Sequence, residues 1–463
     1  MSELHYASLG SVCARIKSGE LTARETVEAT LARIDELDPS LHAYVMVLAD
    51  DALARAEALD EARAAGEMLG PLHGVPIALK DLLFTKGLPT ASGTRVMADF
   101  VPEEDATVVT RLKVAGAVVI GKTQLTEGAY GVHHPDIVDP VNPWAADRWT
   151  GVSSSGSGVA VSAGLCFGAL GSDTGGSIRF PAASCGTVGV KPTYGRVSRH
   201  GAFPLAESLD HIGPMTRTVA DAARMLQVMA GQDPNDATTL AAPVPNYGAE
   251  IGGSVQGLKV GIDWRYVSDG VEAPVVQAVR EALERLAAMG AETVEFQMPM
   301  AYVDLVNQWG VTCGVECARA HEPFYPEQKV LYGPVLSELI ELGRNPPTGA
   351  YDMLETIRAG FTAELEDCFG GMDLMICPNM PYLAPPAAGV LELSADPSRA
   401  NGLTYTAPFD YSGHPTLSLP IGLSEEGLPL SVQLVAPKLG ETVLFRAGSA
   451  LEASFGFEAH PIP

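Results

Sequence analysis

Two short segments in the middle of the chain, residues 151–157 and 171–181, are unusually rich in serine and glycine. Small residues let a backbone turn tightly and expose its N–H groups. A serine nucleophile needs such groups, because they stabilise the oxyanion that forms when the serine attacks a carbonyl. The second segment could provide an oxyanion hole from four consecutive amides, those of Thr174, Gly175, Gly176 and Ser177.

An oxyanion hole is inert without a base, and a lysine is the best candidate for that base. None of the ten histidines sits in a recognisable triad motif. Lys80 ends a buried-looking run that begins at Gly74, and burial would lower the pKa of its side chain and favour the neutral amine. A lone lysine is more often exposed or ion-paired. Together with the serine-rich segments, however, Lys80 favours a lysine base acting on a serine.

Two other patterns are weaker candidates for a functional site. Residues 116–123 match the phosphate-loop pattern G-x4-G-K-T, but the four middle residues, Ala-Val-Val-Ile, are typical of a buried strand and not of an open loop. His133 and His134, with Asp136 and Asp139 nearby, could suggest a metal site. Adjacent histidines on an extended chain point to opposite faces, so we expect a polar loop there and no metal.

The composition is that of a large globular protein with a strong negative charge. The chain has 463 residues, of which 46% are hydrophobic and 19% charged, and it is long enough to bury a large core. Lys and Arg number 30 against 56 Asp and Glu, a formal net charge of −26. Because binding to phosphates needs clustered cations, we expect no nucleic acid and no membrane surface among the partners.

We expect a cytoplasmic protein. The first residues lack the pattern of a signal peptide, and the long uncharged stretch 151–172 holds too much serine and glycine for a membrane span. Seven cysteines without a framework spacing favour a reducing compartment. Cys313 and Cys317 stand four residues apart on a predicted helix, where packing is a commoner role than catalysis.

The elements that must position these residues follow an alternating pattern. Residues 1–65 are predicted to be helical, with a capping box at Thr22–Glu25 and a second helix at about 50–65. Short apolar runs then alternate with helical stretches, which indicates an α/β layered fold with a mixed sheet. The predicted strands are 75–79, 117–120, 165–170, 258–262, 374–377, 417–419 and 430–435, and the clearest helices are 105–115, 219–229 and 273–289.

One interrupted domain is favoured over three independent ones. We expect a helical segment at 1–65 that packs on a catalytic unit at 66–463, within which about 231–412 is more variable and faces the substrate. That region begins with a polar, proline-rich connection at 231–256 and ends with a loop-rich stretch at 378–412.

Taken together, these motifs resemble the amidase signature family. The serine-glycine signature is matched across 151–182, and Lys80 stands in the expected Gly-Val-Pro-x-x-Leu-Lys-Asp context. The resemblance implies Lys80 as base, Ser153 as a bridging serine and Ser177 as the acylated nucleophile. Further family-like segments extend it over most of the chain, at 121–123, 142–144, 191–197, 208–217, 415–420 and 427–433.

Two positions depart from the family pattern without removing a catalytic group. In the family the bridging serine follows a cis peptide bond, which here would be Val152–Ser153. Val152 and Ser155 both stand where glycine is commoner. By family alignment, Gly128, Ala129 and Tyr130 are candidates for the substrate pocket, while the Cys313–Cys317 helix and the loop at 381–386 are weaker ones.

The resemblance also implies a fold and an activity. The fold would be a single α/β/α domain around a large, mostly mixed twisted sheet. The activity would be hydrolysis of linear C–N bonds in small amides, and in some members carbamates (urethanes), ureas or aryl esters, through an acyl-enzyme and without metal or organic cofactor. Dimers are common in such folds, so a homodimer is the assembly to test.

Two other functions remain open. One is the glutaminase (A) subunit of a tRNA-dependent amidotransferase, which resembles the same family. Its paired-arginine segment has no counterpart in residues 332–337, so a stand-alone amidase is favoured. The other is a catalytically dead binding protein, which the three intact positions Lys80, Ser153 and Ser177 disfavour.

Overall fold

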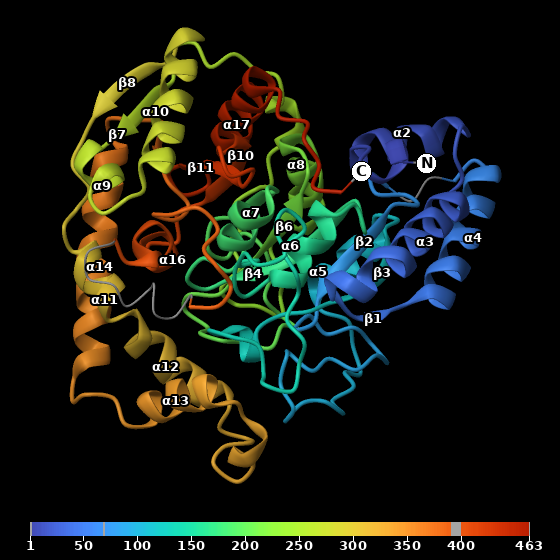
Figure 1. The fold of residues 1–463 in the computed structure, drawn as a ribbon, viewed down its shortest axis with the longest axis horizontal. Helices are drawn as coiled ribbons and strands as arrows, with labels where there is room; N and C mark the ends of the chain where they lie inside the picture. The colour runs from blue at the N-terminus through green and yellow to red at the C-terminus, as the bar shows by residue number, and fades with distance from the viewer. Residues whose placement is uncertain (1, 68–69, 390–399, 463) are drawn as a thin grey trace.

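One mixed sheet runs through the computed structural model, which describes residues 2–67, 70–389 and 400–462 (Figure 1). Within these residues the sheet has 11 strands. β2 pairs in parallel with β3 and β4, and β7 with β8 and β9, whereas the other neighbours are antiparallel. In spatial order the strands are β1 (Tyr44–Val47), β3 (Val118–Thr123), β2 (Pro76–Lys80), β4 (Gly168–Asp173), β6 (His211–Thr216), β5 (Val188–Lys191), β10 (Thr416–Leu423), β11 (Pro429–Val435), β9 (Leu374–Cys377), β7 (Lys259–Ile262) and β8 (Glu292–Glu295).

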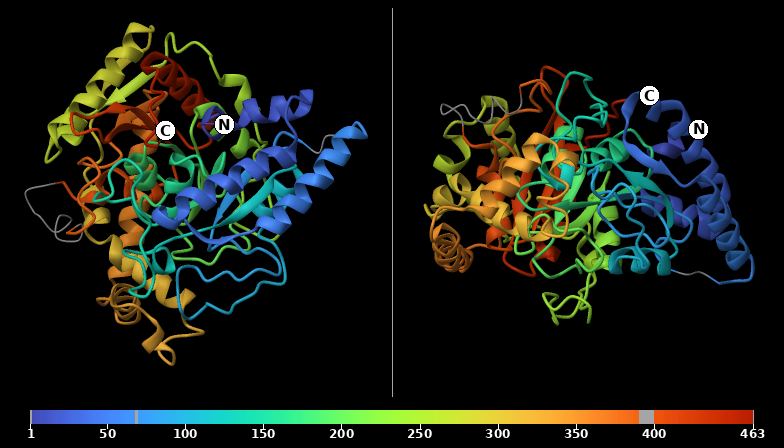
Figure 2. Two further views of the ribbon diagram at one scale, coloured as in Figure 1. Left: turned by 45° about the vertical axis from the view of Figure 1, so that its right-hand side comes forward. Right: turned by 90° about the horizontal axis from the view of Figure 1, so that it is seen from below.

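Helices cover the sheet, and two groups of helices lie at opposite sides of the molecule. The N-terminal helices lie on one side of the molecule, and α12, α13 and α14 lie on the other (Figures 1 and 2). The chain ends meet, because the Tyr6 ring stacks on His460 with centroids 3.8 Å apart. The α-helices are α1 (Ser2–His5), α2 (Leu9–Ser18), α3 (Ala23–Leu41), α4 (Ala49–Ala64), α5 (Thr107–Val114), α6 (Ser155–Ser162), α7 (Arg179–Cys185), α8 (Val219–Met229), α9 (Trp264–Ser268), α10 (Ala273–Ala288), α11 (Tyr302–Asn307), α12 (Trp309–Ala320), α13 (Pro334–Arg344), α14 (Ala350–Phe369), α16 (Ala407–Tyr411) and α17 (Glu441–Phe455).

The expected α/β fold with a mixed sheet is confirmed, and so are several local details. The capping box at the start of α3 is present, with Thr22 and Glu25 bonded reciprocally. Residues 121–123 belong to β3, so the G-K-T pattern is part of a strand and not a phosphate loop. There Lys122 Nζ lies 2.9 Å from Asp81 Oδ1, and both side chains are buried. Among the described helices, none has the length and apolar character needed to cross a membrane.

The prediction that residues 1–65 are all helical is wrong at Tyr44–Val47, which forms the edge strand β1. Helix α3 ends at Leu41 because His42 takes a left-handed conformation, with φ 53°, and its N–H bonds back to the Asp38 carbonyl. The four residues of β1 are Tyr-Val-Met-Val, all aromatic or apolar and three of them with high strand propensity, and the strand pairs antiparallel with β3. The N-terminal segment therefore contributes a strand to the central sheet.

The strand expected at 165–170 lies three residues further along the chain. β4 runs from Gly168 to Asp173, because its antiparallel partner β6 extends the ladder to the Asp173–His211 pair. The apolar run alone had placed it too early. Since β2 and β4 are parallel neighbours, their carboxyl ends meet at one edge of the sheet, which brings Lys80 close to Ser172 and Asp173. In the loop-rich stretch, residues 390–399 lie outside the described residues.

Candidate active site

Lys80, the last residue of β2, is completely buried and is surrounded by serine hydroxyls. Its Nζ lies 2.7 Å from Ser153 Oγ, 2.9 Å from Ser154 Oγ and 2.8 Å from Ser172 Oγ. Burial lowers the pKa of Lys80 from 10.5 to about 7, and the negative charges of Asp173 and Asp210 only partly oppose this shift. A substantial share of Lys80 is therefore a neutral amine near neutral pH, able to accept a proton.

Ser153 stands at a sharp turn just before α6. The Val152–Ser153 peptide bond is cis, as the resemblance implied. Gly151 has φ +81°, and a Cβ there would come within 2.5 Å of the Phe180–Pro181 backbone, so only glycine fits. The Ser153 carbonyl accepts the N–H of Thr126 at 3.2 Å, which ties this turn to the segment after β3.

Ser177 lies in the turn between β4 and α7. It is 8% exposed, against 1% for Ser153 and 0% for Lys80, so it is the member of the three that solvent and substrate reach most easily. Among the described residues no hydrogen bond joins Ser153 Oγ to Ser177 Oγ; the link between the two segments is Ser154 N–H to the Ser177 carbonyl at 3.2 Å. The structure thus brings the three predicted residues to one place, with the base linked directly to Ser153.

Asp173 shapes the turn that carries Ser177. Its carboxylate accepts the N–H groups of Gly176 at 2.7 Å and Ile178 at 2.9 Å. One of the four predicted oxyanion-hole amides, that of Gly176, is therefore already engaged. The N–H groups of Thr174, Gly175 and Ser177 make no hydrogen bond to any described residue, which leaves three donors for an oxyanion.

A buried ion-pair network around Arg179 holds the Asp173 side chain in place. Arg179 Nη2 lies 2.7 Å from Asp173 Oδ1 and 2.7 Å from Asp410 Oδ2, and all three side chains are fully buried. Burial alone would raise the pKa of Asp173, but the charge and hydrogen bonds of Arg179 outweigh it and keep that pKa well below the usual range. Asp173 is therefore ionised, and its charge fixes the backbone of the turn.

Aromatic rings line the turn and explain its two glycines. A Cβ on Gly175 would lie 2.7 Å from the Trp309 ring, and one on Gly176 would lie 2.5 Å from the Phe180 ring. Trp309, the first residue of α12, also donates its indole N–H to the Thr174 carbonyl at 3.2 Å. The turn is thus held in shape by rings on one side and by Asp173 on the other.

The three predicted pocket residues have different neighbours in the structure. Tyr130 stacks on Trp309, with ring centroids 6.1 Å apart, and so belongs to the aromatic wall. Ala129 lines a cavity beside Ser172. Gly128, with φ +57°, instead packs against Leu336 of α13.

The weaker candidates take supporting positions. Cys313 and Cys317 are buried within α12, and burial raises the pKa of both thiols, which disfavours the reactive thiolate. The contact of this helix with the Ser177 turn is made by Trp309. In the loop at 381–386, Tyr382 packs in a small apolar cluster with Phe180.

The two adjacent histidines face different partners. His133 lies between Ser155 and Asp139, with Nε2 3.0 Å from Ser155 Oγ and Nδ1 3.2 Å from Asp139 Oδ1. His134 Nδ1 accepts the backbone N–H of Asp136. The pair therefore stabilises the loop after β3 and joins it to the start of α6.

Sequence reasoning missed several residues that complete the site. Ser154 and Ser172, which bind Lys80, stood inside the recognised segments, and the alternation of side chains along β4 could have separated Ser172 from Asp173. Trp309 and Asp410 come from distant parts of the chain, and no local pattern around either residue points to the Ser177 turn.

The chain is similar to known amidases in both sequence and fold. The family model described as Amidase matches residues 25–445. "Putative amidase AmiD" of Mycobacterium tuberculosis is 42% identical over 98% of this chain and 95% of its own. The A subunit of glutamyl-tRNA(Gln) amidotransferase from Synechococcus sp. is 40% identical, with 95% of each chain covered. A solved structure described as "An unexpected vestigial protein complex reveals the evolutionary origins of an s-triazine catabolic enzyme" superposes with a TM-score of 0.89 at 31% identity, covering 97% of this chain and 98% of the other.

The chain therefore belongs to the amidase signature family of hydrolases, as the motifs around Lys80 and Ser177 implied. The same comparisons show the amidase signature fold, in which a large mixed sheet is covered by helices.

Proposed function

We propose that this protein hydrolyses small amides through an acyl-enzyme on Ser177, with Lys80 as base and Ser153 as the bridging serine. The observation that carries the proposal is the 2.7 Å contact between the buried Lys80 amine and Ser153 Oγ. Next to it is a serine turn in which three N–H groups make no hydrogen bond to a described residue. A lysine with a pKa of about 7 can serve as a base at neutral pH.

Each residue then has one task in the reaction. Lys80 accepts the Ser153 proton while Ser153 accepts that of Ser177, and the Ser177 oxygen attacks the carbonyl carbon. The amides of Thr174, Gly175 and Ser177 hold the negative oxygen of the tetrahedral intermediate. The proton returns along the same path to the leaving nitrogen, the C–N bond breaks, and water later cleaves the acyl-enzyme. Substrate binding has to bring Ser177 Oγ within hydrogen-bond reach of Ser153 Oγ.

The aromatic wall favours an apolar or aryl group on the substrate. Trp309 and Phe180 both contact the glycines of the Ser177 turn, and Tyr130 extends the wall behind Trp309. Amides with an aromatic acyl or leaving group fit such a surface, and aryl carbamates and aryl esters share that shape. We therefore include carbamates and esters in the substrate range.

The second candidate function is glutamine hydrolysis for a tRNA-dependent amidotransferase, which the 40% identity to the A subunit of such an enzyme supports. Glutamine carries an ammonium and a carboxylate, and each needs a charged partner in the pocket. Arg179, the arginine nearest in sequence to Ser177, is already paired with Asp173 and Asp410. Arg179 is therefore engaged within the protein and is not the partner for a glutamine carboxylate.

The decisive experiment compares product release with covalent labelling. A fluorophosphonate should label Ser177, and only Ser177, in peptide mass analysis, and Ser177→Ala should abolish labelling and lower turnover by several orders of magnitude. Ammonia release from glutamine is measured beside release from a panel of aryl amides and carbamates. Labelling at another residue with an active Ser177→Ala variant would overturn the assignment, and glutamine as the best substrate would favour the second function.

A further inference from the structure

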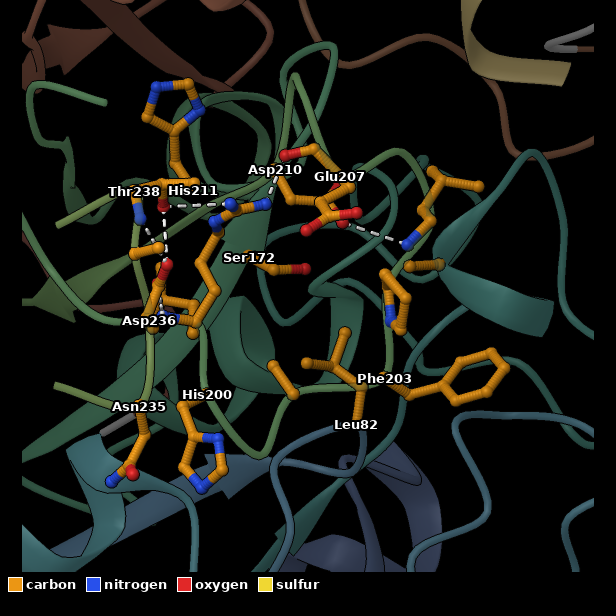
Figure 3. A pocket seen from close by; sticks show the side chains of 17 residues that line it. Leu82, Ser172, His200, Phe203, Glu207, Asp210, His211, Asn235, Asp236 and Thr238 are labelled. Atoms are coloured by element: carbon orange, nitrogen blue, oxygen red, sulfur yellow. Dashed lines mark hydrogen bonds between the residues drawn. The ribbon is translucent and has the colours of Figure 1, made fainter. Parts of the chain in front are cut away.

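A cavity of about 340 Å³ reaches the surroundings of Lys80 without Ser177 among its lining residues. Figure 3 shows Ser172 near the middle of the view, with Asp210 and Glu207 on one side of it and Leu82 and Phe203 on another. A single water needs roughly 10–15 Å³ of such space, so the cavity has room for several. Polar side chains such as Ser172, Asp210 and Asn235 make up part of its lining, so water can fill it.

The cavity joins the base to the protein surface. At its inner end lies Ser172, which is 6% exposed and whose Oγ is 2.8 Å from Lys80 Nζ. At its outer end Glu207, Asn235 and Ala237 are exposed to solvent. Lys80 itself has no exposed surface. Ser172 is thus the point at which the base meets a route to bulk water.

The hydrolytic reaction creates a need for such a route. Cleavage of the acyl-enzyme yields a carboxylic acid, which is a stronger acid than the ammonium form of Lys80 with its pKa of about 7. The acid therefore transfers its proton to the free amine of Lys80, leaving a carboxylate and an ammonium. Lys80 must lose that proton before it can act as base in the next cycle.

We propose that the cavity carries this proton from Lys80 to bulk water through the hydroxyl of Ser172. An N–H bond of Lys80 breaks as a new O–H bond forms on Ser172 Oγ, and the original hydroxyl proton of Ser172 passes to water in the cavity. The resulting hydronium gives its proton to buffer at the outer end. Ser172 ends unchanged, and Lys80 returns to the neutral amine.

Asp210 fits this route as a transient proton acceptor. It lines the cavity, and its Oδ1 accepts the Thr174 hydroxyl at 2.6 Å. Burial raises the pKa of Asp210 to about 6, close to the pKa of Lys80, so a proton can rest on either group at a small cost in free energy.

This inference rests on the proposed role of Lys80 as base, and it is tested by filling the cavity. Ala202→Phe adds a ring to the cavity lining, and Ala359→Phe, which lines a separate cavity, is the matched control. An activated aryl ester is the substrate, because its acylation gives a burst that is separate from later turnover. Thermal unfolding confirms that each variant folds, and Ala202→Leu serves if Ala202→Phe does not.

In Ala202→Phe we expect an unchanged burst rate, a steady-state kcat lower by about tenfold in dilute buffer, and partial recovery as the concentration of a small buffer base rises. Ala359→Phe should behave like the wild type. Ser172→Ala leaves the cavity open but removes the hydroxyl, so its kcat should show the same dependence on buffer concentration. Ser172→Thr keeps a hydroxyl, so its kcat should not depend on buffer concentration.

A folded Ala202→Phe variant with wild-type kcat in dilute buffer would overturn the inference. That result leaves the proposed function intact as long as Ser177→Ala is inactive. If Ser177→Ala retains turnover, in contrast, the proposed function itself fails. The two failures are thus distinguishable.

Discussion

Asp173 Oδ1 lies 2.7 Å from the backbone nitrogen of Gly176 and accepts its N–H. This bond removes one amide from the four that precede or include Ser177, and it fixes the orientation of the other three. The same carboxylate is held by Arg179, so the shape of the oxyanion turn depends on a buried ion pair.

Asp173→Asn should therefore destabilise the protein and impair catalysis together. Removing one partner of a buried ion pair typically costs about 3–5 kcal/mol, because the remaining charge is left without compensation. Urea unfolding measures the free energy of unfolding. The kcat for an aryl amide shows whether the Ser177 turn still supports catalysis. Asp410→Asn is the matched control, since burial raises the pKa of Asp410 well above its usual range and its charge contributes less. A larger loss in Asp410→Asn than in Asp173→Asn would contradict this account.

The pH profile of amide hydrolysis should report the titration of Lys80. Since the amine is the active form and burial lowers its pKa to about 7, kcat/KM for a neutral amide should rise with pH and level off above that value. Lys80→Arg should be nearly as inactive as Lys80→Ala, because guanidinium does not deprotonate in this range. Esters, with better leaving groups, should be less affected.

Lys122→Arg provides a control for that profile. Lys122 is a second buried lysine, paired with Asp81, and has no part in the proposed reaction. A folded Lys122→Arg variant should keep the midpoint near that of the wild type. Near-normal amide turnover in Lys80→Arg would show that Lys80 is only an ion-pair or hydrogen-bond partner.

Trp309 should matter for aromatic substrates more than for small aliphatic ones. Trp309→Ala removes a ring that contacts Gly175 and a hydrogen bond to Thr174, and we expect a loss of stability of about 3–5 kcal/mol along with weaker binding of aryl amides. Trp309→Phe keeps a ring and should retain the preference for aryl amides. Equal kcat/KM losses for aryl and aliphatic amides in Trp309→Ala would argue against an aromatic wall for the substrate.

Glu127 should make stability depend on pH. Burial raises its pKa from 4.5 to about 7, although the N–H of Gly333 opposes the shift with bonds of 3.0 and 3.1 Å. The folded state therefore binds a proton more tightly than the unfolded chain, so the stabilisation is present below about pH 4.5 and is lost as pH rises towards 7. Glu127→Gln should remove this dependence and stabilise the protein at pH 8 by up to about 3 kcal/mol, measured by urea unfolding at several pH values. Identical pH dependence in Glu127→Gln and wild type would refute it.

Local patterns in the sequence were enough to identify the candidate catalytic groups and most of the strands. Lys80 and Ser177 were found because each stands in a local pattern, a buried strand end or a small-residue turn, that depends on neighbours in the chain. The role of Ser153 was predicted from the resemblance of its segment to the amidase signature family. Helices and strands with clear periodicity, such as α3 and β11, were found for the same reason. The short strand β1 was missed because four residues beside two long helices carry little signal of their own, and it forms by pairing with β3.

How these groups act together depends on contacts between parts of the chain that are far apart in sequence. Parallel pairing of β2 and β4 puts Lys80 beside Ser172, and the folding of distant segments brings Trp309 and Asp410 to the Ser177 turn. The loss of the Gly176 amide to Asp173 and the pKa of Lys80 likewise depend on burial and on contacts across the fold. A pKa and a free N–H group are properties of an environment, and that environment is built from residues far apart in the chain.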